Sequence, residues 1–390
     1  MKFLNKNELN PRISVVIGTR PGIIMFSPII RALSSRNLDF FTIHSGQHYS
    51  YNMDELLFDQ LMIPKPTHHL QGISDKKLHG AQTAAMMERI ERILITEKPA
   101  ILLVGGDANT NLAGALAARK LHIAVGHVEA GERSYDWRMP EEHNRRIMDH
   151  ISEYLFATNE KAKQQLFKEN VMGEVFVTGN PIVDAAFQNI ELARESSAVL
   201  KRNRLKEKGY VVLTVHREEN VDSEANLNAI LDSIELVHRE TRLPVFFPAH
   251  PRTLNRLEMF GLVGRARSIE GVTLSEAIGY LDFLRLLSGA ALVMTDSGGV
   301  QQEACILNIP CVTLRENTEW METLSIGANT LAGLEKSKVV AAVMGMLGRT
   351  GSWTIPFGDG SAARNIVRVV EDKVLRGWGK SGSPNLLEKQ

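Results

Sequence analysis

Three acidic residues in the first half of the chain follow short apolar runs closely. Asp107 comes after the run 100–105 and one glycine, Glu129 comes directly after the run 123–128, and Glu141 opens a polar segment further on. An unused carboxylate is costly at the end of an apolar run. Carboxylates that share a cleft push their pKa values apart, which provides both an acid and a base. These residues are therefore candidates for proton transfer, with helix capping and pairing to nearby basic residues as the alternative interpretation.

Two histidines stand in the same position in the second half of the chain. His216 and Arg217 follow the run 210–214, and His250 follows the run 245–247. Histidine titrates near neutral pH, so His216 is a candidate for proton transfer, and together with Arg217 for stabilising a departing diphosphate. A capping or loop histidine explains each of them equally well when it is considered singly.

Two glycine-containing turns are typical of phosphate binding. The turn 18–22 contains Arg20, and the turn 296–299 contains Ser297 and two adjacent glycines ahead of a helical pattern. Free backbone N–H groups at a helix start attract anions. Glu303 lies about one and a half helical turns on, where its carboxylate can accept ribose hydroxyls. The dinucleotide fingerprint G-x-G-x-x-G is absent.

The pattern does not favour a metal site. His44 and His48 are four residues apart, but Gly46 between them indicates a turn and no carboxylate converges on them. Cys305 and Cys311 belong to no metal-binding spacing, and we interpret them as buried thiols. No redox cofactor is indicated.

The elements that must position these residues alternate between strands and helices. Short β-branched runs followed by turns and helical patterns are typical of parallel βαβ units, so the sequence predicts an α/β fold with two doubly wound, Rossmann-like sheets in tandem. The predicted strands are 13–18, 40–44, 100–105, 123–128, 154–157, 175–178, 210–214, 245–247, 272–274, 291–295 and 311–314. Ligands of such sheets sit beyond the carboxyl ends of the strands, so we expect two facing sheets to share a central cleft.

The turn 179–181 marks a domain boundary, because proline cannot continue a central strand. We therefore expect an N-terminal domain over 1–181 and a C-terminal, nucleotide-binding domain over 182–361. A charge-rich helical stretch over 191–208 leads into the second sheet. A helix beginning at 362 packs back on the first domain, and the end of the chain, 379–390, is expected to be frayed.

The overall charge is balanced, with 45 basic and 45 acidic residues among 390. This balance gives no general attraction for nucleic acid or an anionic membrane, so neither partner is expected. The first apolar run, 13–17, is far too short for a signal peptide or a membrane span. We expect a cytosolic protein.

The ordered motifs resemble those of the non-hydrolysing UDP-N-acetylglucosamine 2-epimerases over nearly the whole chain. That family has a two-domain fold like that of the glycosyltransferases of type B. The matching segments are Gly18–Pro21, Gly46–His48, Gly106–Asp107, Gly126–Gly131, Pro140–Glu142, Asn144–Arg145, His216–Glu218, Thr295–Gly299, Gln301 and Glu303.

The resemblance implies that the chain inverts C2 of a UDP-2-acetamido sugar by expelling UDP to give a glycal and then adding it back. It implies a catalytic group of Asp107, Glu129, Glu141 and His216, with no metal or redox cofactor, in a homodimer. The residues that it implies for binding the UDP-sugar are Arg20, Arg145, Arg217, His250, Phe283, Ser297, Gly298, Gly299 and Glu303. Gln47 and His48 resemble part of a second, allosteric site found in some members.

Two departures from the family pattern bear on the substrate. Gly22 and Met25 stand where many members have an acidic residue and a lysine, and Trp320–Met321 replaces Arg-Pro. The segment 46–54 is closer in style to relatives that act on modified sugars. Three alternatives stay open at this point: a hydrolysing relative that releases free N-acetylmannosamine, a glycosyltransferase on the same fold, and a nucleotide-sugar-binding protein without activity.

Overall fold

A computed structural model describes residues 12–47, 51–349 and 353–376. These residues form two compact units, one that runs to Ala185 and resumes at Phe357, and one that covers Ala186–Pro356. The end of the chain expected to be frayed lies outside the described residues.

The N-terminal unit is built on a seven-stranded parallel sheet with the order β3-β2-β1-β4-β5-β6-β7. The order reverses between β1 and β4, which is the point where doubly wound sheets bind ligands. Its strands are β1 (Ile13–Ile17), β2 (Phe40–His44), β3 (His68–His69), β4 (Ile101–Gly105), β5 (Ala124–Ala130), β6 (Tyr154–Ala157) and β7 (Glu174–Val177).

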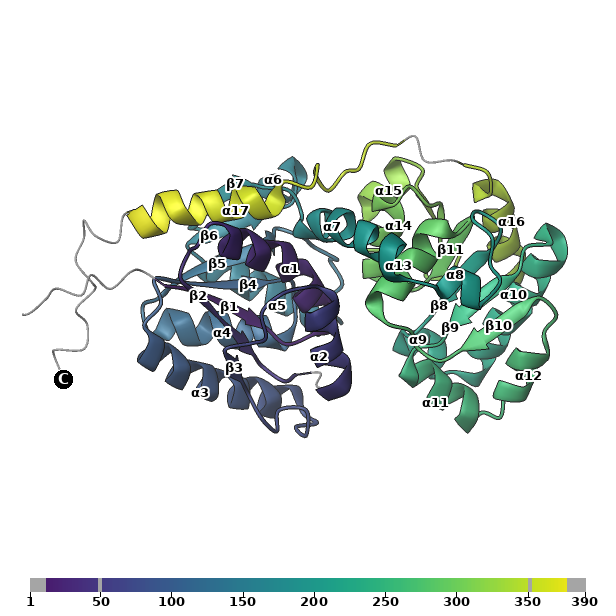
Figure 1. Ribbon diagram of the computed structural model, residues 1–390, viewed down its shortest axis with the longest axis horizontal. Coiled ribbons are helices and arrows are strands. Elements are labelled where there is room, and N and C mark those ends of the chain that lie inside the picture. The colour runs from purple at the N-terminus through teal and green to yellow at the C-terminus, as the bar shows by residue number, and fades with distance from the viewer. Residues whose placement is uncertain (1–11, 48–50, 350–352, 377–390) are drawn as a thin grey trace, which may run out of the picture. The chain divides into compact units, whose positions relative to one another are not determined.

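Helices cover both faces of this sheet, and one of them comes from the far end of the chain. The yellow helix α17 (Ala362–Val370) lies with the N-terminal unit in Figure 1, where it packs against α1 and continues into a π-helical turn, Glu371–Leu375. The other helices are α1 (Arg20–Ser35), α2 (Tyr51–Gln60), α3 (His79–Glu97), α4 (Asn109–Lys120), α5 (Pro140–Ile151) and α6 (Glu160–Lys168). The boundary between the units falls within α7 (Pro181–Ser196).

The C-terminal unit repeats this design with a six-stranded parallel sheet in the order β10-β9-β8-β11-β12-β13. Here the order reverses between β8 and β11. The strands are β8 (Val211–Thr214), β9 (Val245–Pro248), β10 (Val272–Ser275), β11 (Leu292–Thr295), β12 (Cys311–Thr313) and β13 (Asn329–Leu331). The helices are α8 (Val199–Arg202), α9 (Glu218–Val221), α10 (Glu224–Thr241), α11 (Pro251–Met259), α12 (Val263–Ser268), α13 (Tyr280–Gly289), α14 (Gly298–Ile306), α15 (Met321–Ser325) and α16 (Lys336–Met346).

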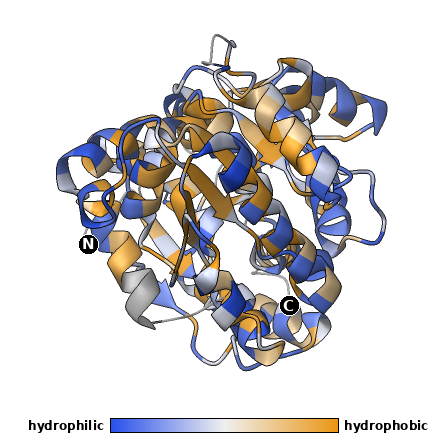
Figure 2. Cartoon of the chain, turned by 90° about the vertical axis from the view of Figure 1, so that its right-hand side faces the viewer, coloured by the Kyte–Doolittle hydropathy of each residue, from blue (hydrophilic) through white to orange (hydrophobic). Residues whose placement is uncertain are grey.

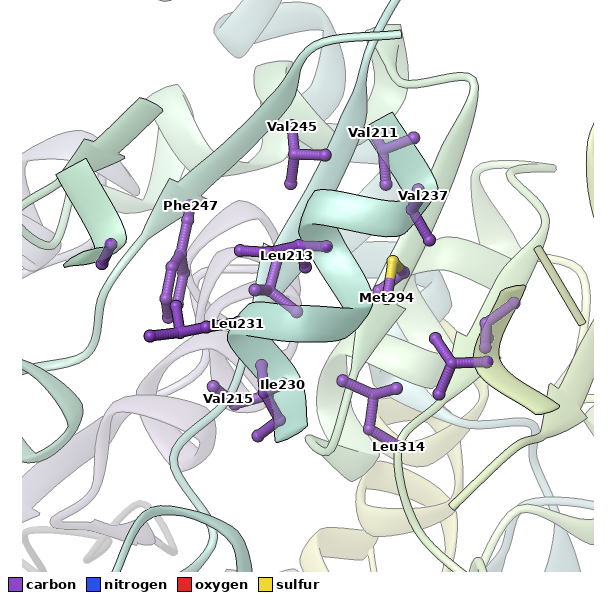
Figure 3. Packing of buried hydrophobic residues seen from close by; sticks show 14 of the residues in the cluster. Val211, Leu213, Val215, Ile230, Leu231, Val237, Val245, Phe247, Met294 and Leu314 are labelled. Atoms are coloured by element: carbon purple, nitrogen blue, oxygen red, sulfur yellow. The ribbon is translucent and has the colours of Figure 1, made fainter. Parts of the chain in front are cut away.

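The central strands are hydrophobic because helices cover them on both sides. Figure 2 shows apolar strands between helices whose outer faces are hydrophilic. In the C-terminal unit, Ile230 and Val237 of α10 pack with Leu213 of β8, Phe247 of β9 and Met294 of β11 (Figure 3). Such close-packed apolar contacts hold the strand ends, and the loops that follow them, in fixed positions.

The structure confirms the predicted α/β class and differs in detail. The short edge strands β3 and β13 were not predicted. The predicted helical stretch 191–208 is only partly helical, because it covers the end of α7, which begins at Pro181 and ends at Ser196, and the short α8, whereas 203–208 are not helical. A proline fits the first turn of a helix, where its missing N–H is no loss, so Pro181 begins α7 instead of only ending a strand. Both cysteines are buried, as predicted. Among the described helices, none is both long and apolar enough to cross a membrane.

Candidate active site

Polar side chains gather at the strand ends on either side of the reversal in the N-terminal sheet. Arg20 follows β1, Asp107 follows β4 and Glu129 lies at the end of β5, and these three strands are neighbours. Because parallel strands end at the same edge of a sheet, the topology brings these residues to one edge. The predicted carboxylates of the first half therefore share one face of one unit.

Glu129 occupies an irregular position in its strand. The pairing of β5 with β6 shifts register between Val128 and Ala130, and Glu129 has a φ of 69°. A bulge of this kind turns a side chain away from its regular direction, and a left-handed conformation is unfavourable for a residue with a Cβ. The backbone strain at Glu129 thus aims its carboxylate at the edge of the sheet.

The surroundings of Glu129 favour its protonated form near neutrality. Loss of hydration raises the pKa of Glu129 to about 7, and the charge of Asp107 adds to the rise. A hydrogen bond from Nδ2 of Asn180 to Oε1, 2.8 Å long, and the charge of Arg145 oppose it. A carboxyl with a pKa near the working pH is suited to take up and release protons.

Asp107 lies in a different environment. Its Oδ2 accepts a hydrogen bond from Nη2 of Arg145 at 2.6 Å, and its side chain is about one third exposed. The backbone carbonyl of Asp107 also accepts from Asn144 at 2.8 Å. Helix α5 thus holds the loop after β4 at two points. The carboxyl groups of Asp107 and Glu129 thus lie in unlike surroundings.

The adjacent glutamates at the start of α5 face different ways. Glu142 is fully buried and accepts hydrogen bonds from Ser134, Arg145 and Arg146. Burial alone would raise the pKa of Glu142, but the bonds from Ser134 and the charge of Arg145 lower it overall. Glu141 is only half-buried and has no hydrogen-bonding partner in the described part of the chain. It lies four residues before Arg145 and therefore on the same face of α5.

Sequence reasoning missed the residues behind these carboxylates. His127 and Asp149 form a fully buried pair, Nδ1 to Oδ1 at 2.7 Å, and Nε2 of His127 contacts the carbonyl oxygen of Gly106 at 3.1 Å. From the sequence, Asn180 is only one residue of the turn 179–181. The apolar run before Glu129 contains a histidine, which was a signal that the strand carries a buried polar partner.

The other residues predicted for the N-terminal unit have mixed placements. Arg20 is the first residue of α1 and is half-exposed at the sheet edge. Gln47 is nearly buried, and its Oε1 accepts from the backbone N–H and hydroxyl of Thr110 at 2.8 and 2.7 Å, so it caps α4. His48 lies outside the described residues. Met25 is buried, and its Cε would lie 2.8 Å from a Cβ at Gly105, which makes an apolar wall beside the strand end.

The C-terminal unit has its own polar group at the reversal between β8 and β11. Asp296 is fully buried and accepts from the backbone N–H groups of His216 and Arg217 and from Asn220. Nδ1 of His216 lies 3.2 Å from Oδ1 of Asp296. Burial alone would raise the pKa of Asp296, but these hydrogen bonds and the His216 charge lower it. An ionised Asp296 orients the His216 ring, which stays about one third exposed.

The glycine turn predicted to bind phosphate begins helix α14, as expected. Ser297 is its N-cap residue, and its hydroxyl makes no capping bond. No atom lies within 4 Å of a Cβ at Gly299, whereas a Cβ at Gly298 would collide with Glu319. Glu319 is in turn paired with Arg315 at 2.9 Å and lies 3.6 Å from Nη2 of Arg217. Two guanidinium groups and a helix start thus converge on one carboxylate, which is the pattern of an anion site.

The remaining predicted residues of this unit lie on neighbouring elements. The ring of His250 is 5.4 Å from that of His216, and its Nδ1 accepts from the N–H of Arg252 at the start of α11. Glu303 is nearly buried in α14, and Phe283 on α13 is partly buried against the core. Each predicted residue of the second half therefore belongs to this unit, while Asp107, Glu129 and Glu141 belong to the other.

The fold and the polar strand ends define the class. Two doubly wound parallel sheets, each with polar side chains at its reversal, match the glycosyltransferase-B-like fold. A glycosyltransferase from Rickettsia africae shares that fold with a TM-score of 0.53 at 12% identity.

The family follows from a closer comparison. The model of the UDP-N-acetylglucosamine 2-epimerase family matches residues 31–371. The chain belongs to this family, in its non-hydrolysing branch, and it is an isomerase.

Three relatives show how close the similarity is. The UDP-N-acetylglucosamine 2-epimerase of Methanocaldococcus jannaschii is 46% identical over 92% of this chain and 98% of its own. Its structure with UDP-GlcNAc and UDP covers 93% of this chain and 99% of its own, with a TM-score of 0.85. The UDP-2,3-diacetamido-2,3-dideoxy-D-glucuronate 2-epimerase of Pseudomonas aeruginosa is 37% identical over 87% of this chain and 93% of its own. The structure of the Neisseria meningitidis 2-epimerase bound to UDP-GlcNAc is 29% identical over 93% of this chain and 100% of its own, with a TM-score of 0.83.

Proposed function

We propose that this isomerase interconverts the C2 epimers of a UDP-2-acetamido sugar, UDP-N-acetylglucosamine and UDP-N-acetylmannosamine or a modified relative. The observation that carries the proposal is the pair formed by Glu129 and Asp107. Glu129 has a pKa raised to about 7, and Asp107 is held in an ion pair with Arg145. Glu129 is poised to exchange protons near neutrality, and the Asp107 carboxyl group is held in place by the guanidinium of Arg145.

In the proposed reaction a carboxylate of the N-terminal unit removes the proton on C2. The electron pair of the C2–H bond forms a C1=C2 double bond as the bond between C1 and the diphosphate oxygen breaks. UDP leaves with the electron pair of the broken C1–O bond, and a 2-acetamidoglycal remains. A carboxylic acid then protonates C2 from the opposite face while UDP adds back to C1, so no atom is gained or lost.

We assign proton transfer to Asp107, Glu129 and Glu141, and we place His216 at the departing diphosphate. Glu141 supports this assignment because it is half-buried and makes no hydrogen bond among the described residues. Asp296 anchors the His216 ring. A histidine ring anchored in this way can donate a hydrogen bond to a phosphate oxygen. Charge developing on the leaving group is best stabilised by groups that are already in place.

We assign the uridine diphosphate to the C-terminal unit, with the phosphates at Arg217 and the start of α14. Ser297, Gly298 and Gly299 present backbone N–H groups there, and Glu303 in the same helix is suited to accept ribose hydroxyls. His250 and Phe283 complete this group, and within the N-terminal unit we assign Arg20 and Arg145 to binding of the UDP-sugar as well. Gln47 is assigned only a weak role at a second site, because its carbonyl oxygen already caps α4.

We further propose a cytoplasmic homodimer. A groove of about 440 Å³ between α3, α4 and α5 is lined by Met87, Leu112 and Leu116, which supports contact with a second copy. Sedimentation of the protein, alone and as the Leu112→Asp variant, tests this assembly. A monomer at micromolar concentration would contradict it.

A single assay tests the reaction. UDP-N-acetylglucosamine is incubated with the enzyme in deuterated water and followed by NMR. We expect deuterium at C2 and a second nucleotide sugar with inverted C2. Free N-acetylmannosamine with UDP would indicate a hydrolysing enzyme instead, and transfer without deuterium at C2 would indicate a glycosyltransferase. Turnover of only a diacetamido-uronic substrate would move the assignment to a modified sugar.

A further inference from the structure

Asn180 is buried where the N-terminal unit leaves its last strand and begins α7. Its Nδ2 donates to Oε1 of Glu129 at 2.8 Å, and its Oδ1 accepts from the backbone N–H of Ile182 at 3.1 Å. The second bond fixes which way the amide points. A flipped side chain would place its oxygen against the carboxylate and its N–H groups against another N–H.

The backbone of Asn180 is held just as firmly. Its N–H donates to the carbonyl oxygen of Phe357 at 2.7 Å, at the point where the chain returns to the N-terminal unit. Gly179 and Gly358 both have left-handed conformations, and a Cβ at Gly358 would lie 3.1 Å from Cα of Gly179. Two segments nearly 180 residues apart thus lock together at this point, so Asn180 presents its N–H group from a rigid support.

We propose that Asn180 is a positioning residue for the reaction, which anchors Oε1 of Glu129 and leaves Oε2 as the oxygen that exchanges a proton with C2 of the substrate. This inference rests on the proposed function, because it takes Glu129 as one of the proton-transfer groups. Oε2 lies on the side of Gly106, 3.6 Å from the position of a Cβ there. With one oxygen anchored, the rotation of the carboxyl group is fixed before the substrate arrives.

Asn180 also sets the charge state of Glu129 without titrating itself. The charged and titratable groups that face Glu129 are Asp107 from the end of β4, His127 from β5 and Arg145 from α5. Asn180, from the segment before α7, adds the single neutral donor. A donated hydrogen bond favours the ionised carboxylate, so it limits the rise in pKa that burial causes. Without that donor, a smaller fraction of Glu129 would be ionised at neutral pH.

Two substitutions separate the role of Asn180 at Glu129 from its structural role as the cap of α7. In Asn180→Ser the hydroxyl oxygen can still cap α7, but the side chain is too short to reach Glu129. In Asn180→Asp the cap is kept and an acceptor replaces the donor. Asn365→Ala is the matched control. Asn365 on α17 donates to the carbonyl of Thr178, next to the contact between Gly179 and Gly358, but it makes no bond to Glu129.

The experiment measures kcat, kcat/KM against pH, UDP affinity by calorimetry and Tm for each full-length variant. We expect Asn180→Ser to lower kcat about tenfold or more and to move the acid limb of kcat/KM upward by about one pH unit, and Asn180→Asp to move it further. UDP affinity should stay within about twofold, and Asn365→Ala should keep the wild-type pH profile.

Three results would count against the role of Asn180. Wild-type kcat and an unmoved acid limb in both Asn180 variants would overturn it. The same shift of the acid limb in Asn365→Ala would show that a loosened contact between the two segments is responsible, and not the loss of the hydrogen bond from Asn180 to Glu129. If the wild-type enzyme itself placed no deuterium at C2, the proposed function would fail instead, so the two failures are distinguishable.

Discussion

Nη2 of Arg145 lies 2.6 Å from Oδ2 of Asp107, and this ion pair ties helix α5 to the loop after β4. Burial alone would lower the pKa of the Arg145 guanidinium, but the Asp107 and Glu142 carboxylates raise it overall. Arg145 therefore stays charged beside the carboxyl groups of Asp107 and Glu129. The cation is thus part of the carboxylate group of the N-terminal unit.

The first prediction concerns Asp107. Asp107→Asn should lower turnover by about a hundredfold or more, because an amide neither exchanges a proton nor pairs with Arg145 as an anion. Steady-state kinetics measure the effect, and Asp75→Asn at an exposed position is the control. Turnover within a few-fold of wild type would remove Asp107 from the proton-transfer group.

The adjacent glutamates of α5 allow a matched comparison. Glu141→Gln should lower turnover by about a hundredfold with little change in Tm, because Glu141 makes no bond among the described residues. Glu142→Gln should destabilise the fold by about 3–5 kcal/mol, because it breaks the ion pairs that the fully buried Glu142 makes with the buried Arg145 and the half-buried Arg146. Kinetics and thermal unfolding of both variants distinguish the roles, and an exchange of the two effects would reverse the assignment.

Glu129 should make stability depend on pH. Its pKa is raised from 4.5 to about 7 in the folded protein, so between these values the folded state binds more protons than the unfolded state. Stability contributed by this group is therefore present below about pH 4.5 and lost as the pH rises to 7. Glu129→Gln, which cannot ionise, should have a higher Tm than wild type at pH 8, with a difference that shrinks towards pH 5. A lower Tm at pH 8 would contradict the raised pKa.

Asp184 should be required for docking of the C-terminal helix. Its carboxylate oxygens accept from the backbone N–H groups of Ala362 and Ala363, at 3.2 and 3.0 Å, and so cap α17. Asp184→Ala should lower the free energy of unfolding by about 1–2 kcal/mol, the usual value of a helix cap. Denaturant unfolding measures this loss. Asp359→Ala, which changes an exposed turn before α17, should have a smaller effect, and an equal one would contradict the cap.

Glu319 should compete with the phosphates of UDP for the guanidinium groups of Arg315 and Arg217. It neutralises Arg315 and lies near Arg217 at the start of α14. Glu319→Gln removes that negative charge, so the affinity for UDP should rise about three- to tenfold. Calorimetric titration measures it, with the exposed Glu316→Gln as control. Weaker binding would mean that Glu319 orients the arginines instead of competing for them.

Much of this arrangement was predictable because parallel strands leave a strong local signal. The runs before Asp107, Glu129 and His216 are apolar, and a glycine or polar turn follows each of them, so the strand ends could be placed within one or two residues. The two-residue strand β3 has no such signal. Its residues His68 and His69 are only half-buried, and pairing with β2 alone makes them a strand.

The finer features of the site depend on contacts that sequence patterns do not carry. The bulge at Glu129 follows from packing between β5 and β6, and its donor Asn180 is 51 residues away. The sequence Glu141–Glu142 does not indicate which side chain is buried. The rotation of α5 decides it, because it places Glu142, and not Glu141, against Ser134. Gln47 has a motif-like setting, yet its carbonyl oxygen caps a helix that begins more than sixty residues later.

The return of the chain at Phe357 has a practical consequence for recombining this enzyme with its relatives. Residues 186–356 are inserted in the N-terminal unit, so that unit cannot be cut out as one continuous gene fragment. A chimaera that exchanges only the stretch 186–356 would leave Asp184 its bonds to α17 and α1 its packing partner. The C-terminal unit can then be exchanged as one continuous segment, whereas a simple head-to-tail fusion would remove α17 from the first sheet.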